Sequence, residues 1–159
     1  MDINTNIKKI GTIHGRDFNF TLNLDNEYIK GLTEIKGFSH LQILWWAHAV
    51  SENDRNRLLE TKPYTKGPDT IGTFATRSPL RPNPILLTTI YVQKLDLEKG
   101  IIHTPYIDAD DGSPILDIKP YHLIERVQNC QVPDWCSHWP AYYEEAGNFN
   151  WEAEFNFSL

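Results

Sequence analysis

The sequence has few positive charges and no long apolar run, and each of these shortages argues against a class of binding partner. The formal net charge is −6 with histidines neutral, from 15 basic and 21 acidic residues. An acidic chain has an unfavourable overall field for a phosphate backbone, so any contact with nucleic acid must be local. No uncharged apolar run approaches the roughly 20 residues that a membrane helix requires. The sequence therefore predicts no membrane partner.

Cysteine is also scarce. The only two, Cys130 and Cys136, match neither a Cys-x-x-Cys motif nor a usual disulfide framework, so they are predicted to be free thiols. Residues 1–6 lack the basic and then apolar pattern of a secretion signal. We therefore expect a cytoplasmic protein.

Several common active-site motifs are missing. The sequence contains no Gly-x-Gly-x-x-Gly, no P-loop and no Gly-x-Ser-x-Gly nucleophile elbow. Its histidines, among them His103, His122 and His138, show no metal-ligand spacing. These absences argue against the standard nucleotide-binding and hydrolase classes, and we predict no metal.

Alternating residues give the clearest secondary-structure signal. Phe18, Phe20, Leu22 and Leu24 alternate with polar residues, which predicts a strand with one wet face. Residues 7–14 are its predicted hairpin partner, joined through a turn at residues 15–17.

The next strong signal is the apolar run at residues 38–48, which is too apolar for an edge strand. In an extended conformation, one face carries Leu41, Ile43, Trp45 and Ala47. Further short strands are predicted at residues 71–74, 85–94, 101–106 and 115–118, a spacing that favours a barrel or a strongly curled sheet.

With 159 residues and 40% hydrophobic content, the chain fits one domain. We expect a mainly β fold: a single compact β-barrel at residues 1–159, with short helices. Residues 122–159 form an aromatic C-terminal extension with Trp135, Trp139, Tyr142, Tyr143, Phe149, Trp151, Phe155 and Phe157. Bare in water it would be a large apolar patch, so it should pack on the barrel or on a dimer partner.

Prolines stiffen the segment at residues 72–84, which also carries two arginines. Each proline fixes its own φ and drives the preceding residue toward extended geometry. Arg77, Arg81 and Asn83 therefore lie on a rigid frame, and arginine binds carboxylates and phosphates in a planar fork. The segment predicts an anion-binding loop, and the alternative is an edge loop with solvated arginines.

Carboxylates crowd the turn at residues 108–112, where one of them is suited to accept hydrogen bonds from ribose hydroxyls. A calcium loop would need a bidentate glutamate at its twelfth position, where this chain has Lys119. A plain solvated turn is the remaining alternative. Asp117 and Lys119 share a strand face, and they either pair with each other or serve the site.

Three segments carry a resemblance to a known family. They are Gly-Phe-Ser-His-Leu at residues 37–41, Gly-Thr-Phe-Ala-Thr-Arg-Ser-Pro-Leu-Arg-Pro-Asn-Pro-Ile at 72–85 and Asp-Ala-Asp-Asp-Gly-Ser-Pro-Ile-Leu-Asp-Ile-Lys-Pro-Tyr at 108–121. Together they resemble the TsaA-like family, also called the YaeB-like or TrmO family. The resemblance runs from about Ile7 to Tyr121. One departure is residues 15–17, where bacterial tRNA-modifying members have Pro-Arg-Gln.

The resemblance implies a β-barrel methyltransferase that acts as a homodimer with S-adenosylmethionine. The best-known members methylate N6 of threonylcarbamoyladenosine at position 37 of a tRNA. Matching positions imply that the donor binds at His48, Ala49, Arg77, Leu87, Asp108, Ala109, Asp110 and Asp111. For the acceptor we assign Arg81, Asn83, Asp117, Lys119 and Tyr121, and we name no general base.

Two other functions stay open at this stage. One is methylation of a small molecule or another macromolecule, which the acidic charge favours. The other is a non-catalytic module that binds S-adenosylmethionine.

Overall fold

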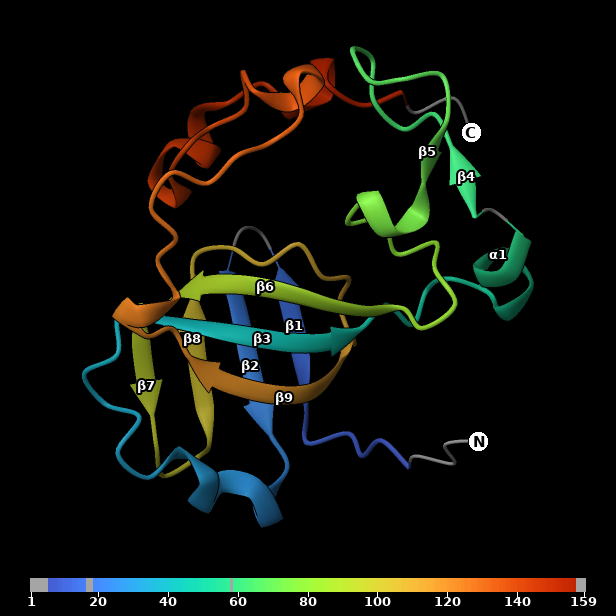
Figure 1. The fold of residues 1–159 in the computed structure, drawn as a ribbon. Coiled ribbons are helices and arrows are strands. Elements are labelled where there is room, and N and C mark those ends of the chain that lie inside the picture. Colours follow the sequence, from blue (N-terminus) through green and yellow to red (C-terminus); the bar gives the residue numbers. More distant parts are fainter. Residues whose placement is uncertain (1–5, 17–18, 58, 157–159) are drawn as a thin grey trace.

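The computed structural model describes residues 6–16, 19–57 and 59–156, and most of its regular structure is β (Figure 1). The strands are β1 (Gly11–Arg16), β2 (Asn19–Leu24), β3 (His40–Trp46), β4 (Glu60–Thr61), β5 (Ile71–Gly72), β6 (Ile85–Tyr91), β7 (Lys94–Asp96), β8 (Ile101–Thr104) and β9 (Pro114–Pro120). The helical elements are α1 (Glu52–Arg57) and the 3₁₀ helices η1 (Asn26–Leu32), η2 (Thr73–Ala75), η3 (Leu123–Glu125), η4 (Asp134–Cys136), η5 (Tyr143–Asn148) and η6 (Trp151–Ala153). The prediction of a mainly β chain with short helices is confirmed.

Seven strands form one antiparallel sheet in the order β6-β3-β9-β1-β2-β8-β7. In Figure 1, β6, β3 and β9 run across the direction of β1, β2, β8 and β7, so the sheet is strongly curled. A short pairing joins the two groups, with Gly11 opposite Ile115 and Thr12 opposite Pro114.

The predicted closed barrel is not found, because no pairing joins β6 to β7 within the described residues. Closure requires the two edge strands to pair along their length. Here β7 has only three residues, and they pair with β8. The sheet therefore stays open.

The core follows the alternation of the strands. Along β3, Leu41 and Ile43 are fully buried and Trp45 is nearly so, which confirms that these residues share one face of the strand. β3 lies between β6 and β9, as expected for a strand too apolar for an edge. The fully or almost fully buried aliphatic residues are Ile13, Leu22, Leu41, Ile43, Ile90, Ile102, Ile107 and Ile115.

Several predicted boundaries were wrong. β1 begins at Gly11 and includes Gly15 and Arg16, which were predicted to turn, while residues 17 and 18 lie outside the described part. The predicted strand at residues 71–74 ends after Gly72, where the backbone tightens into η2. No helix of the described ranges is long and apolar enough to cross a membrane.

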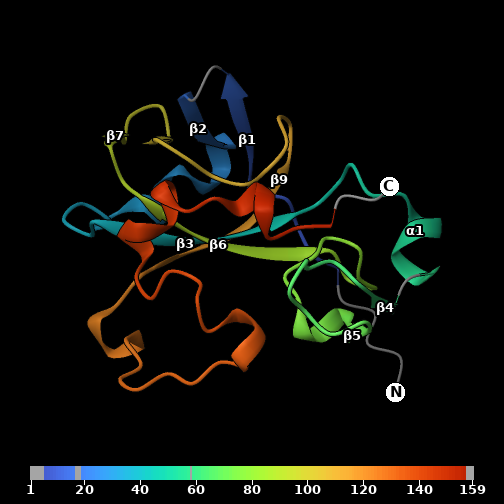
Figure 2. The same cartoon turned by 90° about the horizontal axis from the view of Figure 1, so that it is seen from above.

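The C-terminal segment, here called the tail (residues 122–156), leaves β9 and reaches the segment that contains β4 and β5. Figures 1 and 2 show it in orange and red, running from the end of the sheet to that green segment. An isolated β-bridge pairs Tyr64 with Phe155 at the contact. Residues 157–159 of the predicted extension lie outside the described part.

Candidate functional site

Thr88 on β6 links the core of the sheet to the turn at residues 108–112, here called the acidic turn. The indole Nε1 of Trp45 donates to Thr88 Oγ1 at 3.0 Å, and Thr88 Oγ1 donates to Asp108 Oδ1. A hydroxyl can donate and accept at once. Thr88 therefore fixes the acidic turn against a nearly buried tryptophan.

Arg77 brings the segment at residues 72–84, here called the proline-rich segment, to the same strand. Its Nη2 donates to the backbone oxygen of Leu87, the residue before Thr88. The proline-rich segment and the acidic turn therefore meet at two consecutive residues of β6. That the two segments share one donor-binding cavity stays a prediction.

Replacing Thr88 with valine tests this link. Valine has a similar shape but lacks the hydroxyl, so the indole N–H of Trp45 loses its acceptor. We expect a loss of about 1 kcal/mol in the free energy of unfolding, measured by urea titration. The matched control, Thr89→Val on the same strand, should cost less. Equal costs for the two variants would contradict the assigned role of Thr88.

His48 approaches the far end of the acidic turn. The backbone N–H of Ala47 donates to the oxygen of Pro84 at 2.9 Å, which ties the end of β3 to the start of β6. His48 Nδ1 then lies 3.2 Å from the hydroxyl of Ser113, whose side chain is buried. Gly112 turns the chain here with a φ of +86°, which side-chain-bearing residues rarely adopt. Ala49 follows His48 and is exposed.

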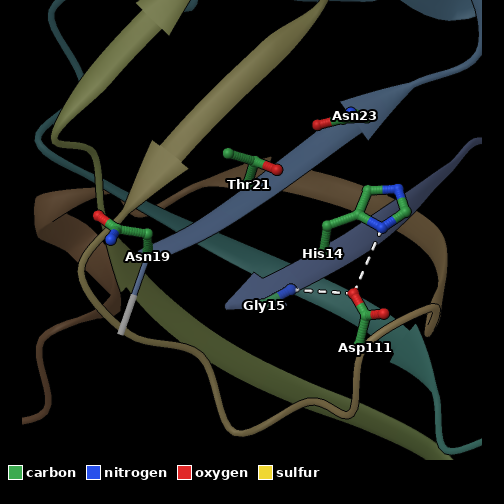
Figure 3. A pocket seen from close by; sticks show the side chains of 6 residues that line it. All are labelled: His14, Gly15, Asn19, Thr21, Asn23 and Asp111. Atoms are coloured by element: carbon green, nitrogen blue, oxygen red, sulfur yellow. Dashed lines mark hydrogen bonds and ion pairs between the residues drawn. The ribbon is translucent and has the colours of Figure 1, made fainter. Parts of the chain in front are cut away.

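Asp111, also in the acidic turn, points toward the hairpin of β1 and β2 (Figure 3). Its Oδ1 accepts from the backbone N–H of Gly15 at 3.1 Å and lies 3.4 Å from His14 Nδ1. These residues line an open hollow of about 310 Å³ together with the polar side chains of Asn19, Thr21 and Asn23. Sequence reasoning missed the hollow, although the alternation of β2 did place those three polar residues on one face.

Arg81 serves its own loop. Its guanidinium donates to the backbone oxygens of Ser78 at 2.8 Å, Thr73 at 3.1 Å and Thr76 at 2.7 Å. These bonds brace the proline-rich segment from within. Asn83 is exposed, and its backbone oxygen accepts from the N–H of Ile85 at 2.7 Å. The assignment of Arg81 and Asn83 to the acceptor stays a prediction.

Asp117 and Lys119 form an ion pair with 2.7 Å between Oδ2 and Nζ. The hydrogen bond to Asp117 raises the pKa of Lys119 above its ordinary value. Tyr121 follows, and its backbone N–H donates to the oxygen of His40 at 3.1 Å.

Within one chain, Asp117 lies nearer to the donor candidates than Lys119 and Tyr121 do, because Asp117 is opposite Leu44 of β3 and Leu44 is opposite Leu87 of β6. Lys119 pairs with Gln42 and Tyr121 with His40, near the start of β3, whereas His48 follows its end. Those two ends are about 20 Å apart at the rise of a strand.

The cysteines form no disulfide within the part of the chain that the structure describes. Cys130 is exposed and Cys136 is buried, and both are free, as predicted. Burial raises the pKa of the Cys136 thiol. Among the residues that the structure describes, no group of three or more His, Cys, Asp or Glu could hold a metal ion.

Comparison with known proteins decides the family. A sequence profile described as the tRNA-methyltransferase O N-terminal domain matches residues 11–124. The chain belongs to this family. The TrmO resemblance is therefore confirmed, and the profile match covers the hairpin, the proline-rich segment and the acidic turn.

Two relatives illustrate the family. A probable S-adenosyl-L-methionine-binding protein of Methanocaldococcus jannaschii is 33% identical over 114 residues, covering 71% of this chain and 89% of that protein. A tRNA (adenine(37)-N6)-methyltransferase of Eikenella corrodens is 34% identical over 110 residues, covering 69% and 62%. This TrmO-family chain thus spans less than two thirds of the Eikenella protein.

A solved structure supports the fold. The crystal structure of TrmO from Pseudomonas aeruginosa superposes with a TM-score of 0.62 and 24% identity. The match covers 81% of this chain and 62% of that one. The open, curled sheet is therefore a TrmO-like fold.

Proposed function

We propose that this TrmO-family chain is an S-adenosylmethionine-dependent methyltransferase that methylates N6 of threonylcarbamoyladenosine at position 37 of tRNA. The observation that carries the proposal is the meeting of the proline-rich segment and the acidic turn at Leu87 and Thr88. Relatives in Eikenella corrodens and Mus musculus are named tRNA (adenine(37)-N6)-methyltransferases, which supports the acceptor. Relatives named S-adenosyl-L-methionine-binding proteins support the donor.

In the proposed donor site, Arg77 binds the carboxylate of the donor and the acidic turn binds its ribose. The turn contributes Asp108, Ala109, Asp110 and Asp111, while His48, Ala49 and Leu87 complete the wall. A carboxylate-rich turn also favours a cationic sulfonium by simple charge complementarity. The donor supplies the methyl group, and these residues bind and orient it.

Methyl transfer is an in-line displacement, in which the sulfur–carbon bond breaks as the bond to N6 forms and the N6 proton leaves. The protein's main task is to place the acceptor nitrogen about 3–3.5 Å from the methyl carbon. The polar hollow between His14 and Asp111 borders the acidic turn. We propose that it receives part of the acceptor base.

A homodimer is part of the proposal, because it would bring Lys119 and Tyr121 to a donor site. Within one chain, Lys119 and Tyr121 lie at the opposite end of β3 from His48. In a dimer, they and Asp117 would contact acceptor bound at the partner's donor site, beside Arg81 and Asn83. The proposed location is the cytoplasm, where tRNA is modified.

The direct test uses labelled donor and threonine tRNA that carries threonylcarbamoyladenosine without the N6-methyl group. The chain should transfer label to N6 of that nucleoside, and it should not label the same tRNA without the threonylcarbamoyl group. Label in a small molecule or another macromolecule of an extract would redirect the acceptor assignment. Donor binding with no adenosylhomocysteine from any acceptor would contradict catalysis.

A further inference from the structure

His14 forms part of the wall of the polar hollow. It lies directly opposite Thr21 in the pairing of β1 with β2, so the two side chains share one face of the hairpin. Asn19 and Asn23 lie on the same face, two residues to either side of Thr21. Figure 3 shows this polar row of β2 beside the imidazole ring. The hollow, of about 310 Å³, therefore sets a histidine opposite hydroxyl and amide groups.

Backbone hydrogen bonds on both sides of His14 hold the acidic turn against β1. The N–H of Gly112 donates to the oxygen of Ile13 at 2.8 Å. On the other side of the histidine, the N–H of Gly15 donates to Asp111 Oδ1 at 3.1 Å. The same Oδ1 lies 3.4 Å from His14 Nδ1. The pairing of the turn with β1 therefore keeps the carboxylate of Asp111 next to the ring.

The carboxylate of Asp111 determines which ring nitrogen of His14 holds the proton. An ionised carboxylate only accepts hydrogen bonds, so the neutral imidazole beside it holds its proton on Nδ1. Nε2 then keeps its lone pair, and within the described part of the chain it makes no hydrogen bond. The side chains of His14 and Asp111 are 49% and 60% exposed, so a substrate can reach this nitrogen. An ion pair this exposed adds little to stability.

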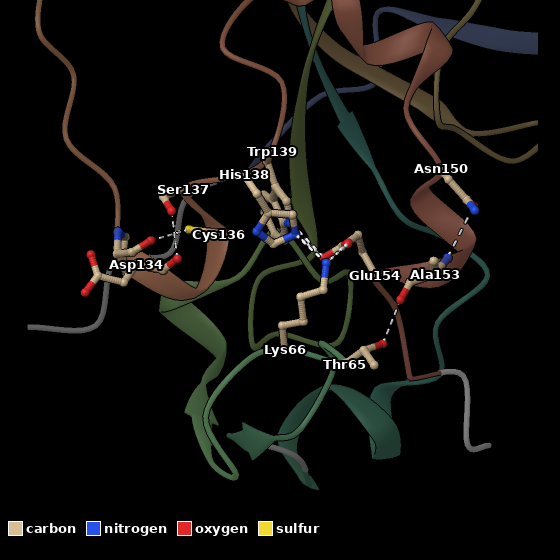
Figure 4. A network of polar contacts seen from close by, with 11 residues as sticks. Thr65, Lys66, Asp134, Cys136, Ser137, His138, Trp139, Asn150, Ala153 and Glu154 are labelled. Atoms are coloured by element: carbon tan, nitrogen blue, oxygen red, sulfur yellow. Dashed lines mark hydrogen bonds and ion pairs between the residues drawn. The ribbon is translucent and has the colours of Figure 1, made fainter.

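A second histidine–carboxylate pair, in the tail, has a structural role. His138 Nε2 lies 2.8 Å from Glu154 Oε2, and the Glu154 side chain is only 5% exposed. The same carboxylate accepts from Trp139 Nε1 and from Lys66 Nζ, each at 3.1 Å (Figure 4). Trp139 also packs edge-on against the ring of Tyr64, with centroids 5.1 Å apart. This pair satisfies a buried charge and holds the tail in place, whereas the pair on the acidic turn faces an open hollow.

The proposed acceptor nitrogen needs a base more than an ordinary amine does. N6 of threonylcarbamoyladenosine carries a single hydrogen, and its lone pair is delocalised into both the purine and the carbamoyl carbonyl. It is therefore a weak nucleophile while it keeps that hydrogen, and the methylated product has none. A general base within hydrogen-bond reach of the departing proton contributes about 100-fold to 10,000-fold in rate.

The acidic turn places His14 beside the proposed donor site. Asp108, which Thr88 fixes, is one of the predicted donor contacts, and Asp111 follows it by three residues. Three residues of chain span at most about 11 Å. An adenine base in the hollow can therefore approach both the imidazole and the methyl group of a donor bound at the turn.

We propose that His14 is the general base of the methyl transfer and that Asp111 is the positioning residue that orients its ring. The proposal rests on the proposed function, which supplies the acceptor nitrogen. As N6 bonds to the methyl carbon, the sulfur–carbon bond breaks with its electron pair on sulfur. The N6 proton passes to His14 Nε2 and then to water. The carboxylate of Asp111 stabilises the imidazolium that forms.

The sharpest variant is His14→Asn, whose amide keeps a donor near the place of Nδ1 and removes Nε2. With saturating donor and tRNA, the rate of a single turnover should fall about 100-fold, while calorimetry should show S-adenosylmethionine binding unchanged. His14→Gln puts an amide nitrogen without a basic lone pair near the place of Nε2, and it should lose about as much. His103→Asn, at a histidine of β8 outside the hollow, is the matched control and should keep the wild-type rate.

A double-variant cycle tests the role of Asp111. Because Asp111 is also a proposed donor contact, its variants are compared at saturating donor. Asp111→Asn should slow the single turnover in the wild-type background and slow it little further in the His14→Asn background, because the carboxylate acts through the ring. Equal slowing in the two backgrounds would contradict the positioning role.

Failure of the base assignment and failure of the proposed function give different results. If the wild type methylates the tRNA nucleoside and both His14 variants keep its rate, the base assignment is overturned and the proposed function stands. Weaker donor binding in these variants, with a full rate at saturation, would make His14 a donor contact and would also overturn it. If the wild type transfers no methyl group to that nucleoside, the proposed function fails and the base assignment fails with it. Both variants should keep the wild-type unfolding midpoint, because the pair is exposed.

Discussion

Replacing Arg77 with alanine is expected to raise the dissociation constant of S-adenosylmethionine about 30-fold, or about 2 kcal/mol. An isolated exposed charge would contribute at most about 1 kcal/mol. Arg77 should contribute more, because its hydrogen bond to the oxygen of Leu87 already fixes the guanidinium and donor binding would bury it. Isothermal titration calorimetry measures the change directly.

Two control variants show whether the effect depends on the shape of the Arg77 guanidinium and on its position in the chain. Arg77→Lys keeps the charge but loses the planar fork, so its affinity should lie between those of wild type and alanine. Arg126→Ala removes an exposed arginine of the tail and should leave donor affinity unchanged. A wild-type affinity in Arg77→Ala would remove Arg77 from the donor site.

Glu154→Gln should lower the thermal unfolding midpoint at pH 7 by on the order of 5 °C. Burial of the Glu154 carboxylate raises its pKa, but hydrogen bonds from Trp139, His138 and Lys66 outweigh that effect and lower the pKa from 4.5 to about 2. The ionised form is therefore the one that the fold stabilises. Glutamine keeps the size of the side chain and loses the charge that this group of donors favours.

The lowered pKa of Glu154 also determines how the stability of the fold depends on pH. Because the folded-state pKa lies below the unfolded value, the stabilisation is fully present above about pH 4.5 and is lost as pH falls toward about 2. Calorimetric midpoints of wild type and Glu154→Gln should converge across that window. Glu152→Gln, an exposed neighbour in η6, should follow the wild type. A constant gap between wild type and Glu154→Gln would contradict the assignment.

Local patterns predicted the strands better than their closure. The alternation around Leu41 and Ile43 correctly placed these residues on one face of β3, because successive side chains of a strand point to opposite faces. Barrel closure depends on whether β6 and β7 meet, which is a contact between distant edges. No local pattern specifies that contact, and the prediction of a barrel was wrong for this reason.

The candidate site shows the same difference between local features, which the sequence predicts, and distant contacts, which it does not. Proline spacing predicted a stiff segment, and the family motifs assign Arg77 and the acidic turn to one donor site, which stays a prediction. The sequence could not reveal that the Arg81 guanidinium would donate its hydrogen bonds to backbone oxygens of its own loop. It also gave no sign that Tyr64 would lie against Trp135, because the two residues are far apart in the chain.

The placement of the tryptophans gives the molecule an optical consequence. Of its five tryptophans, Trp135, Trp139 and Trp151 belong to the tail and cluster near Tyr64, while Trp45 and Trp46 belong to β3. Intrinsic emission therefore reports chiefly on docking of the tail, whereas circular dichroism in the far ultraviolet reports on the sheet. The two signals followed together would resolve release of the tail from global unfolding without any added dye.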